Sequence, residues 1–148
     1  MIRLSLVLAV VSLFAGQNSA QTTGAIVIYR VRVYYAGGVH PTVYCDGIKV
    51  AKMRESRRAM LSASVGQHTC VAIERQTGAN EDSDKVSVDL KPGSTIYLRL
   101  KYPFGHTRFV LQQVSEEIGS AEAAKLQPTK KGDCYTTVLP VIADKGPS

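Results

Sequence analysis

Short stretches in which apolar residues alternate with polar ones, separated by turn residues, recur through most of this chain. Residues 25–35 (AIVIYRVRVYY) are dense in β-branched and aromatic side chains, which favour strands. Their continuous apolar start at 26–28 predicts a strand whose first half is covered on both faces. Residues 85–90 and 95–102 alternate more regularly, so each is predicted to form a strand with one buried face.

The strongest local signal is the Asp46-Gly47 pair between the stretches 42–45 and 48–53. A type I′ turn needs positive φ at both central residues, so Asp-Gly between apolar stretches predicts a β-hairpin. We expect this hairpin to fix the register of the strands beside it.

A second pair of strands is predicted directly after the hairpin. Residues 54–58 form a charged connection, and residues 59–64 and 67–75 are expected to pair with each other around Val65-Gly66. Residues 76–84 (QTGANEDSD) have no apolar period, so we expect an exposed loop there.

The last third of the chain adds a turn, a strand and a helix. Residues 91–94 (KPGS) place proline and glycine where a type II turn needs them, and residues 107–114 form the last predicted strand. Ser115 precedes good helix formers, which predicts a short helix that Gly119 weakens. About seven to eight short strands and one C-terminal helix indicate a mainly β fold. We predict an antiparallel β-sandwich of the immunoglobulin-like or prealbumin-like kind.

The first twenty residues differ from the rest of the chain. Arg3 precedes an apolar run that is short for a bilayer, and Ala20 supplies a small residue for cleavage. We predict a signal peptide at 1–20, cleaved after Ala20, with an uncleaved membrane anchor as the alternative. The predicted organisation is then a β-sandwich domain at 21–126 and a loosely ordered tail at 127–148. The mature protein is expected to be periplasmic or secreted, with no transmembrane segment.

The charge balance indicates the kind of partner. The chain has 18 Lys and Arg against 12 Asp and Glu, and the leader contains one Arg and no acid, so the mature net charge is +5. This excess favours anionic lipids, glycans or acidic proteins as partners. Export argues against a nucleic-acid partner.

Five basic residues cluster on and after the predicted hairpin. They are candidates for binding an anionic lipid or glycan, although charged side chains on an edge strand also block unwanted sheet pairing. The five are Lys49, Lys52, Arg54, Arg57 and Arg58.

Three cysteines form the second candidate site. Cys45 and Cys70 both fall on inward-facing strand positions, so a disulfide between them is predicted in an oxidising compartment. Three cysteines allow three pairings, however, and Cys134 can instead pair with either of the others, pair between chains or stay free. The alternative is a copper(I) or zinc site formed by Cys45, His68 and Cys70, but their spacing matches no zinc pattern. We therefore predict no metal ligands and no cofactor.

Signatures of catalysis are missing from the sequence. It contains no G-x-S-x-G, no H-E-x-x-H, no phosphate-binding glycine loop and no dinucleotide-binding fingerprint. The three histidines, His40, His68 and His106, have no acidic residue at an interpretable spacing. We predict that the protein is not an enzyme and that its tyrosines lie at the core boundary, with a tyrosine-lined ligand face as the alternative.

The order of these motifs resembles the DUF2846 family of bacterial envelope proteins over about residues 25–126. The matching pieces are VIYR at 27–30, PTVYCDGIKV at 41–50, GQHT at 66–69, LKPGSTIYLRL at 90–100 and AAKL at 123–126. The hairpin and GQHT also resemble the shorter PEGA-type β module. The resemblance implies an envelope β-sandwich without known activity or catalytic residues. Many family members resemble lipoproteins, whereas this leader lacks a lipid-acceptor cysteine.

These observations lead to three hypotheses. The first is an exported, non-catalytic binding or structural protein of the bacterial cell envelope, whose partner is an envelope protein or an anionic surface. The second is a module that binds anionic lipid or glycan through the basic hairpin. The third is a small exported enzyme or metal-binding protein that uses Cys45, His68 and Cys70.

Overall fold

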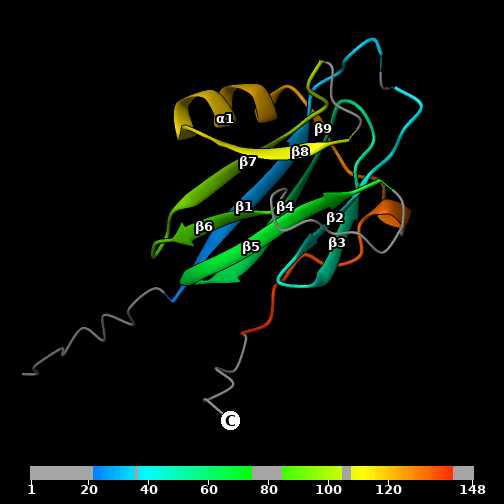
Figure 1. Ribbon diagram of the computed structural model, residues 1–148. Coiled ribbons are helices and arrows are strands. Elements are labelled where there is room, and N and C mark those ends of the chain that lie inside the picture. Colours follow the sequence, from blue (N-terminus) through cyan, green and yellow to red (C-terminus); the bar gives the residue numbers. More distant parts are fainter. Residues whose placement is uncertain (1–21, 36, 75–84, 105–107, 142–148) are drawn as a thin grey trace, which may run out of the picture.

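Two β-sheets pack face to face in this protein, and one helix covers the outer face of the first (Figure 1). The computed structural model describes residues 22–35, 37–74, 85–104 and 108–141. Within them the predicted mainly β fold, a β-sandwich with one short helix, is confirmed. The predicted leader and the predicted loop at 76–84 lie outside the described residues. In the part that is described, no helix has the length and apolar character needed to cross a membrane.

The first sheet has the strand order β8-β7-β1-β4-β9. The pairs β1/β7 and β4/β9 are parallel, so this sheet is mixed where the sequence predicted antiparallel pairing throughout. After β6 in the second sheet, the chain crosses back to the first sheet, where β7 lies beside β1 and runs in the same direction. The strands are β1 (Thr23–Arg30), β4 (Arg57–Ser64), β7 (Thr95–Lys101), β8 (Val110–Val114) and β9 (Gln127–Pro128).

The second sheet is antiparallel, with the order β3-β2-β5-β6. Its hairpin has the predicted turn, with φ of 53° at Asp46 and 76° at Gly47. The turn before β7 likewise has the predicted positive φ at Gly93, and Ser94 N donates to Lys91 O. The strands are β2 (Thr42–Cys45), β3 (Ile48–Lys52), β5 (Gly66–Ile73) and β6 (Val86–Leu90).

The strand pair predicted around Val65-Gly66 is wrong. β4 lies in the first sheet and β5 in the second, and the chain crosses between the sheets at Gly66, whose φ of 124° favours glycine. A glycine between two alternating stretches marks a change of direction, but it does not show whether the next strand joins the same sheet.

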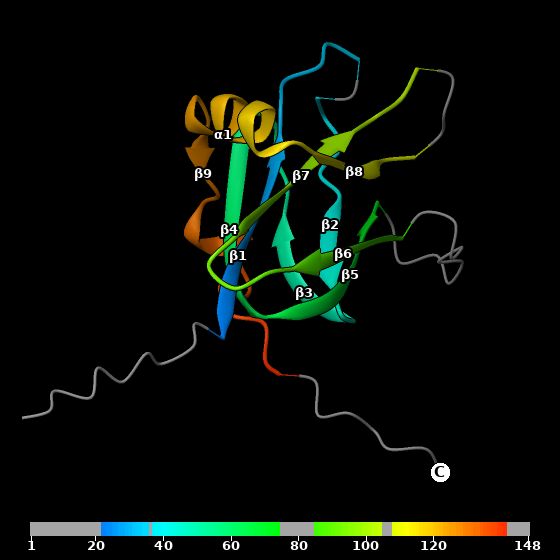
Figure 2. The ribbon, with the colours of Figure 1, turned by 90° about the vertical axis from the view of Figure 1, so that its left-hand side faces the viewer.

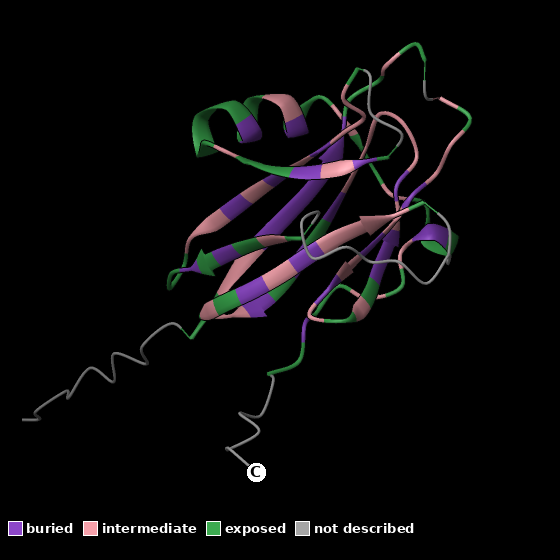
Figure 3. Ribbon diagram, in the orientation of Figure 1, coloured by how far each residue is buried: buried purple, intermediate pink, exposed green. Residues whose placement is uncertain are grey.

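The predicted strand at 25–35 is too long, because β1 ends at Arg30. At this point its partners run out: Arg57 opposite Arg30 is the first residue of β4, and the pairing with β7 stops at Tyr29. The predicted burial of its first half on both faces is confirmed. Ile26 and Ile28 face the core between the sheets, whereas Val27 and Tyr29 pack with the helix side. Figure 3 shows β1 buried without interruption over its second half, whereas strands such as β4 and β6 alternate between buried and exposed residues.

The helix α1 (Glu116–Ala124) begins at the predicted serine cap, where Ser115 Oγ accepts from Ile118 N. Gly119 does not interrupt it. A Cβ at this position would lie 2.3 Å from Cβ of Tyr97, so the glycine lets the helix approach β7 closely. The hydroxyl of Tyr29 donates to Glu122 at 2.6 Å and ties the helix to the sheet.

Gly119→Ala should therefore destabilise the protein, although the same change in an exposed helix stabilises by about 0.5–1 kcal/mol. We expect a loss of about 1–3 kcal/mol, because the added methyl group forces α1 away from Tyr97. Urea unfolding of Gly119→Ala beside Ser120→Ala, which lies on the exposed side of the same helix, measures the effect. A more stable Gly119→Ala variant would show that this close contact does not form.

Residues 127–141 form a segment that we call the C-terminal strap, which runs beside β4 along the open side of the sandwich (Figure 2). Thr129 N and Leu139 N donate to the β4 carbonyls of Arg58 and Ser62, and Tyr135 N donates to Val50 O of β3. The side chain of Leu139 is buried in the core. The loosely ordered tail predicted at 127–148 is thus wrong for 127–141, because the edges of both sheets offer this segment backbone partners. Residues 142–148 lie outside the described residues.

Candidate functional site

Cys45 and Cys70 form a disulfide, as predicted. They stand directly opposite each other on the paired strands β2 and β5, with 4.1 Å between their Cα atoms. Cys134 is free and half-buried in the strap. The disulfide therefore links two neighbouring strands of the second sheet, next to the hairpin turn.

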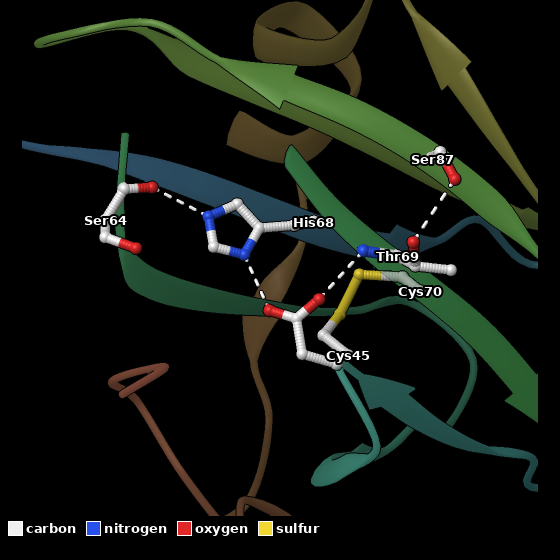
Figure 4. A network of polar contacts seen from close by, with 7 residues as sticks. Cys45, Ser64, His68, Thr69, Cys70 and Ser87 are labelled. Atoms are coloured by element: carbon white, nitrogen blue, oxygen red, sulfur yellow. Dashed lines mark hydrogen bonds and ion pairs between the residues drawn. A yellow bond between two sulfur atoms is a disulfide. The ribbon is translucent and has the colours of Figure 1, made fainter. Parts of the chain in front are cut away.

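A buried ion pair lies beside the disulfide (Figure 4). Nδ1 of His68 is 2.6 Å from one carboxylate oxygen of Asp46, and the other carboxylate oxygen accepts from Thr69 N at 2.9 Å. Nε2 of His68 is 2.7 Å from the backbone oxygen of Ser64. The side chain of His68 is 3% exposed, so water does not compete for these contacts. Asp46 thereby joins the hairpin turn to β5.

The partners of His68 determine its charge. A carboxylate and a carbonyl oxygen are both acceptors, so both ring nitrogens must donate, and only the imidazolium can do this. Burial alone lowers the pKa of His68, but the hydrogen bonds to Asp46 and Ser64 and the charge of Asp46 together outweigh it and raise the pKa above its usual value.

This geometry rules out two roles for His68. The metal site proposed from Cys45, His68 and Cys70 is wrong, because both sulfurs are in the disulfide and both ring nitrogens have partners. No group of three potential metal ligands occurs elsewhere among the described residues. Ser64 offers its backbone oxygen, so His68 does not activate the Ser64 hydroxyl as a nucleophile.

The ion pair predicts how stability depends on pH. Unfolded His68 has a pKa of about 6.5, and the folded pKa is higher. The stabilisation by this ion pair is therefore complete below about pH 6.5 and is lost as pH rises through the folded pKa.

Asp46→Asn keeps a residue that suits the type I′ turn but removes the carboxylate. We expect the free energy of unfolding of this variant to be about 1–2 kcal/mol lower at pH 6. Its free energy of unfolding should also change less between pH 6 and 8 than that of the unaltered protein. Urea unfolding across that range tests this, and an unchanged pH profile would contradict the charged pair.

Four of the five basic residues predicted to bind anions contact the chain's own C-terminal region. The guanidinium of Arg54 pairs with Asp133 at 2.6 Å, and this hydrogen bond lowers the pKa of Asp133. The other contacts are Arg57 to Pro128 O at 3.2 Å, Arg58 to Ala123 O at 2.9 Å and Lys49 over the Tyr135 ring at 4.0 Å. Lys52 is half-buried on β3, and its charge also favours ionised Asp133. Lys49, Arg54 and Arg57 thus hold the strap, whereas Arg58 binds the last turn of α1.

A different surface lies at the end of the sandwich opposite Thr22 and Val141, the first and last described residues. The loops that follow β1 and β7 both project there (Figure 2). They leave from the same end because β1 and β7 are parallel neighbours. We call this surface the aromatic end, because four aromatic side chains form one row of ring contacts. Centroid distances are 4.9 Å for Phe109–Tyr102, 6.2 Å for Tyr102–Tyr35 and 6.5 Å for Tyr35–Phe104.

The inner part of this row is buried and fixed. The guanidinium of Arg30 lies 4.6 Å from the Phe109 ring and donates to Val39 O and Met53 O, which secures the base of the first loop. Val33 N donates to Glu55 at 3.2 Å in the same loop. Burial lowers the pKa of Arg30 and the charge of Glu55 opposes that effect, so the two charges balance inside the protein.

The outer part of the aromatic end is open to solvent. Tyr34 is 98% exposed, Phe104 93% and Tyr35 60%. Arg32 is also exposed, with its guanidinium 6.0 Å from the Tyr34 ring. The sequence expectation that the tyrosines lie at the core boundary is therefore wrong for Tyr34 and Tyr35. The two loops lie at the same end because β1 and β7 are parallel neighbours. No local sequence pattern shows this pairing, so the aromatic end was not predicted.

Comparisons of this chain with protein-family models, curated proteins and solved structures give no match. The class that fold and site define is a disulfide-bonded β-sandwich with an exposed aromatic end.

Proposed function

We propose that this chain is an exported, non-catalytic β-sandwich protein of the bacterial cell envelope that binds its partner through the aromatic end. The observation that carries the proposal is the set of exposed rings, Tyr34, Tyr35 and Phe104, on a base fixed by Arg30. Tyrosine and other aromatic side chains dominate binding surfaces because they contribute a large contact area at a small cost in conformational entropy. A fixed base reduces that cost further.

Three observations support the envelope as the location. The N-terminal pattern is that of a signal peptide, and the Cys45–Cys70 disulfide suits an oxidising compartment. The resemblance to the DUF2846 family points to the bacterial envelope. The basic hairpin gives less support for anion binding, because Lys49, Arg54, Arg57 and Arg58 already have contacts within the chain.

Site-specific crosslinking in the native host tests the binding surface. A photoreactive amino acid replaces Tyr34 in one variant and Met60 in the control. Met60 is an exposed apolar residue in the middle of β4, away from the aromatic end. We expect a defined crosslinked product from position 34 and none from position 60. Equal crosslinking from both positions, or none from position 34, would contradict the proposed surface.

A further inference from the structure

We infer that the aromatic end docks onto the surface of a phospholipid bilayer that contains anionic headgroups. This inference rests on the proposed function, because it names the partner of the same surface. It follows from the shape of this end, the chemistry of its rings and the sign of its exposed charge.

The projecting shape of the aromatic end suits a flat and deformable surface. Tyr34 and Phe104 are almost fully exposed and lie on loops that extend beyond the sheets (Figure 1). Side chains on projecting loops penetrate a soft surface, whereas small ligands are bound in concave sites lined on several sides. The two rings come from loops after different strands, so the protein would contact the surface at two points and its orientation would be set.

The ring chemistry fits the bilayer interface. Tyrosine has an apolar ring and a polar hydroxyl, and such side chains concentrate at the level of the lipid headgroups. The more apolar Phe104 is almost as exposed as Tyr34, and leaving so large an apolar ring in water is unfavourable. Partition into the interface removes both rings from water without requiring a shaped pocket.

The charges of this end favour anionic lipid. Arg32 stands beside Tyr34 with its side chain exposed, where it can reach a phosphate once the ring is inserted. Glu55, in the connection between β3 and β4, is half-buried, accepts from Val33 N and offsets the charge of the buried Arg30. The exposed Arg32 is therefore available to the bilayer surface, whereas the charge of Glu55 is directed to partners within the protein. The mature net charge of +5 acts in the same direction.

The chain contains no tryptophan, so a single introduced tryptophan reports on its own surroundings. Tyr34→Trp places a single fluorescent reporter at the aromatic end, and Met60→Trp places one at a matched exposed position on β4. We expect vesicles of phosphatidylcholine mixed with phosphatidylglycerol to shift the emission of Tyr34→Trp to shorter wavelength. Emission from Met60→Trp should not shift.

Cosedimentation with the same vesicles measures the affinity. The double variant Tyr34→Ala/Phe104→Ala should bind at least about tenfold more weakly, because two rings no longer leave water. Arg32→Gln should bind the mixed vesicles about fivefold more weakly and pure phosphatidylcholine vesicles no differently. All these substitutions are at exposed positions, so unchanged urea unfolding serves as the check on folding.

The outcomes separate the two proposals. No emission shift and no cosedimentation would overturn the bilayer inference. If position 34 still crosslinks to a protein in the host, the proposed function stands with a protein partner. If position 34 neither inserts nor crosslinks, both proposals fail.

Discussion

Removal of residues 127–148 is expected to cost the domain a large part of its stability. Leu139→Ala alone should cost about 2–4 kcal/mol, because the side chain is 2% exposed and fills space between the sheets. The truncation also removes the backbone hydrogen bonds from the strap to β3 and β4. Domains are commonly stable by only about 5–15 kcal/mol, so the truncated chain should be partly unfolded at room temperature.

The truncation has a second consequence, because it opens two sheet edges at once. β4 and β3 would each present unpaired N–H and C=O groups that the strap covers in the intact protein. The folded fraction of the truncated chain should therefore self-associate through these edges. The basic side chains that hold the strap at this edge, Arg54 and Arg57, would be released and would limit this association at low salt.

Two truncations of the chain test this expectation. One ends at Leu126 and removes the strap, and the control ends at Val141 and keeps every contact described for it. Urea unfolding followed by circular dichroism compares their stabilities, and light scattering at low and high salt measures association. If both truncations unfold at the same urea concentration and stay monomeric, the strap does not belong to the cooperative unit.

Local features of the fold were predictable, whereas the sheet assignments were not. The Asp46-Gly47 hairpin, the positive φ at Gly93 and the cap at Ser115 depend on a few neighbouring residues, and all three are found. That β4 and β5 belong to different sheets depends on partners far along the chain. The same holds for the strap, whose binding surface is formed by β3 and β4.

The candidate sites follow the same division. The disulfide was predictable because side-chain alternation places Cys45 and Cys70 on inward faces. The Asp46–His68 pair was missed, although the signal was present: Asp46 follows Cys45, and His68 shares the face of Cys70 two residues earlier. Joining the cysteines brings these two side chains together. The aromatic end had no such signal, because its loops meet only through the parallel β1/β7 pair.

Loss of the Cys45–Cys70 disulfide should have the second largest effect. The bond closes a loop with a sequence separation of 25 residues, and restricting the unfolded chain in this way stabilises by about 2–4 kcal/mol. It also holds the hairpin against β5, where Asp46 reaches His68 and Thr69. Cys45→Ala/Cys70→Ala should therefore lower the free energy of unfolding by about 2–4 kcal/mol and weaken the pH dependence due to His68.

Thiol counting and unfolding together test this prediction. Alkylation of the unreduced, denatured protein should modify Cys134 alone, and alkylation after reduction should modify all three cysteines. Cys134→Ala is the matched control, because it removes a cysteine without breaking a bond. Equal losses of stability in the control and in the double variant would mean that the effect comes from side-chain packing. Three modified thiols before reduction would mean that the bond does not form, and the oxidising location proposed for the protein would lose its chemical support.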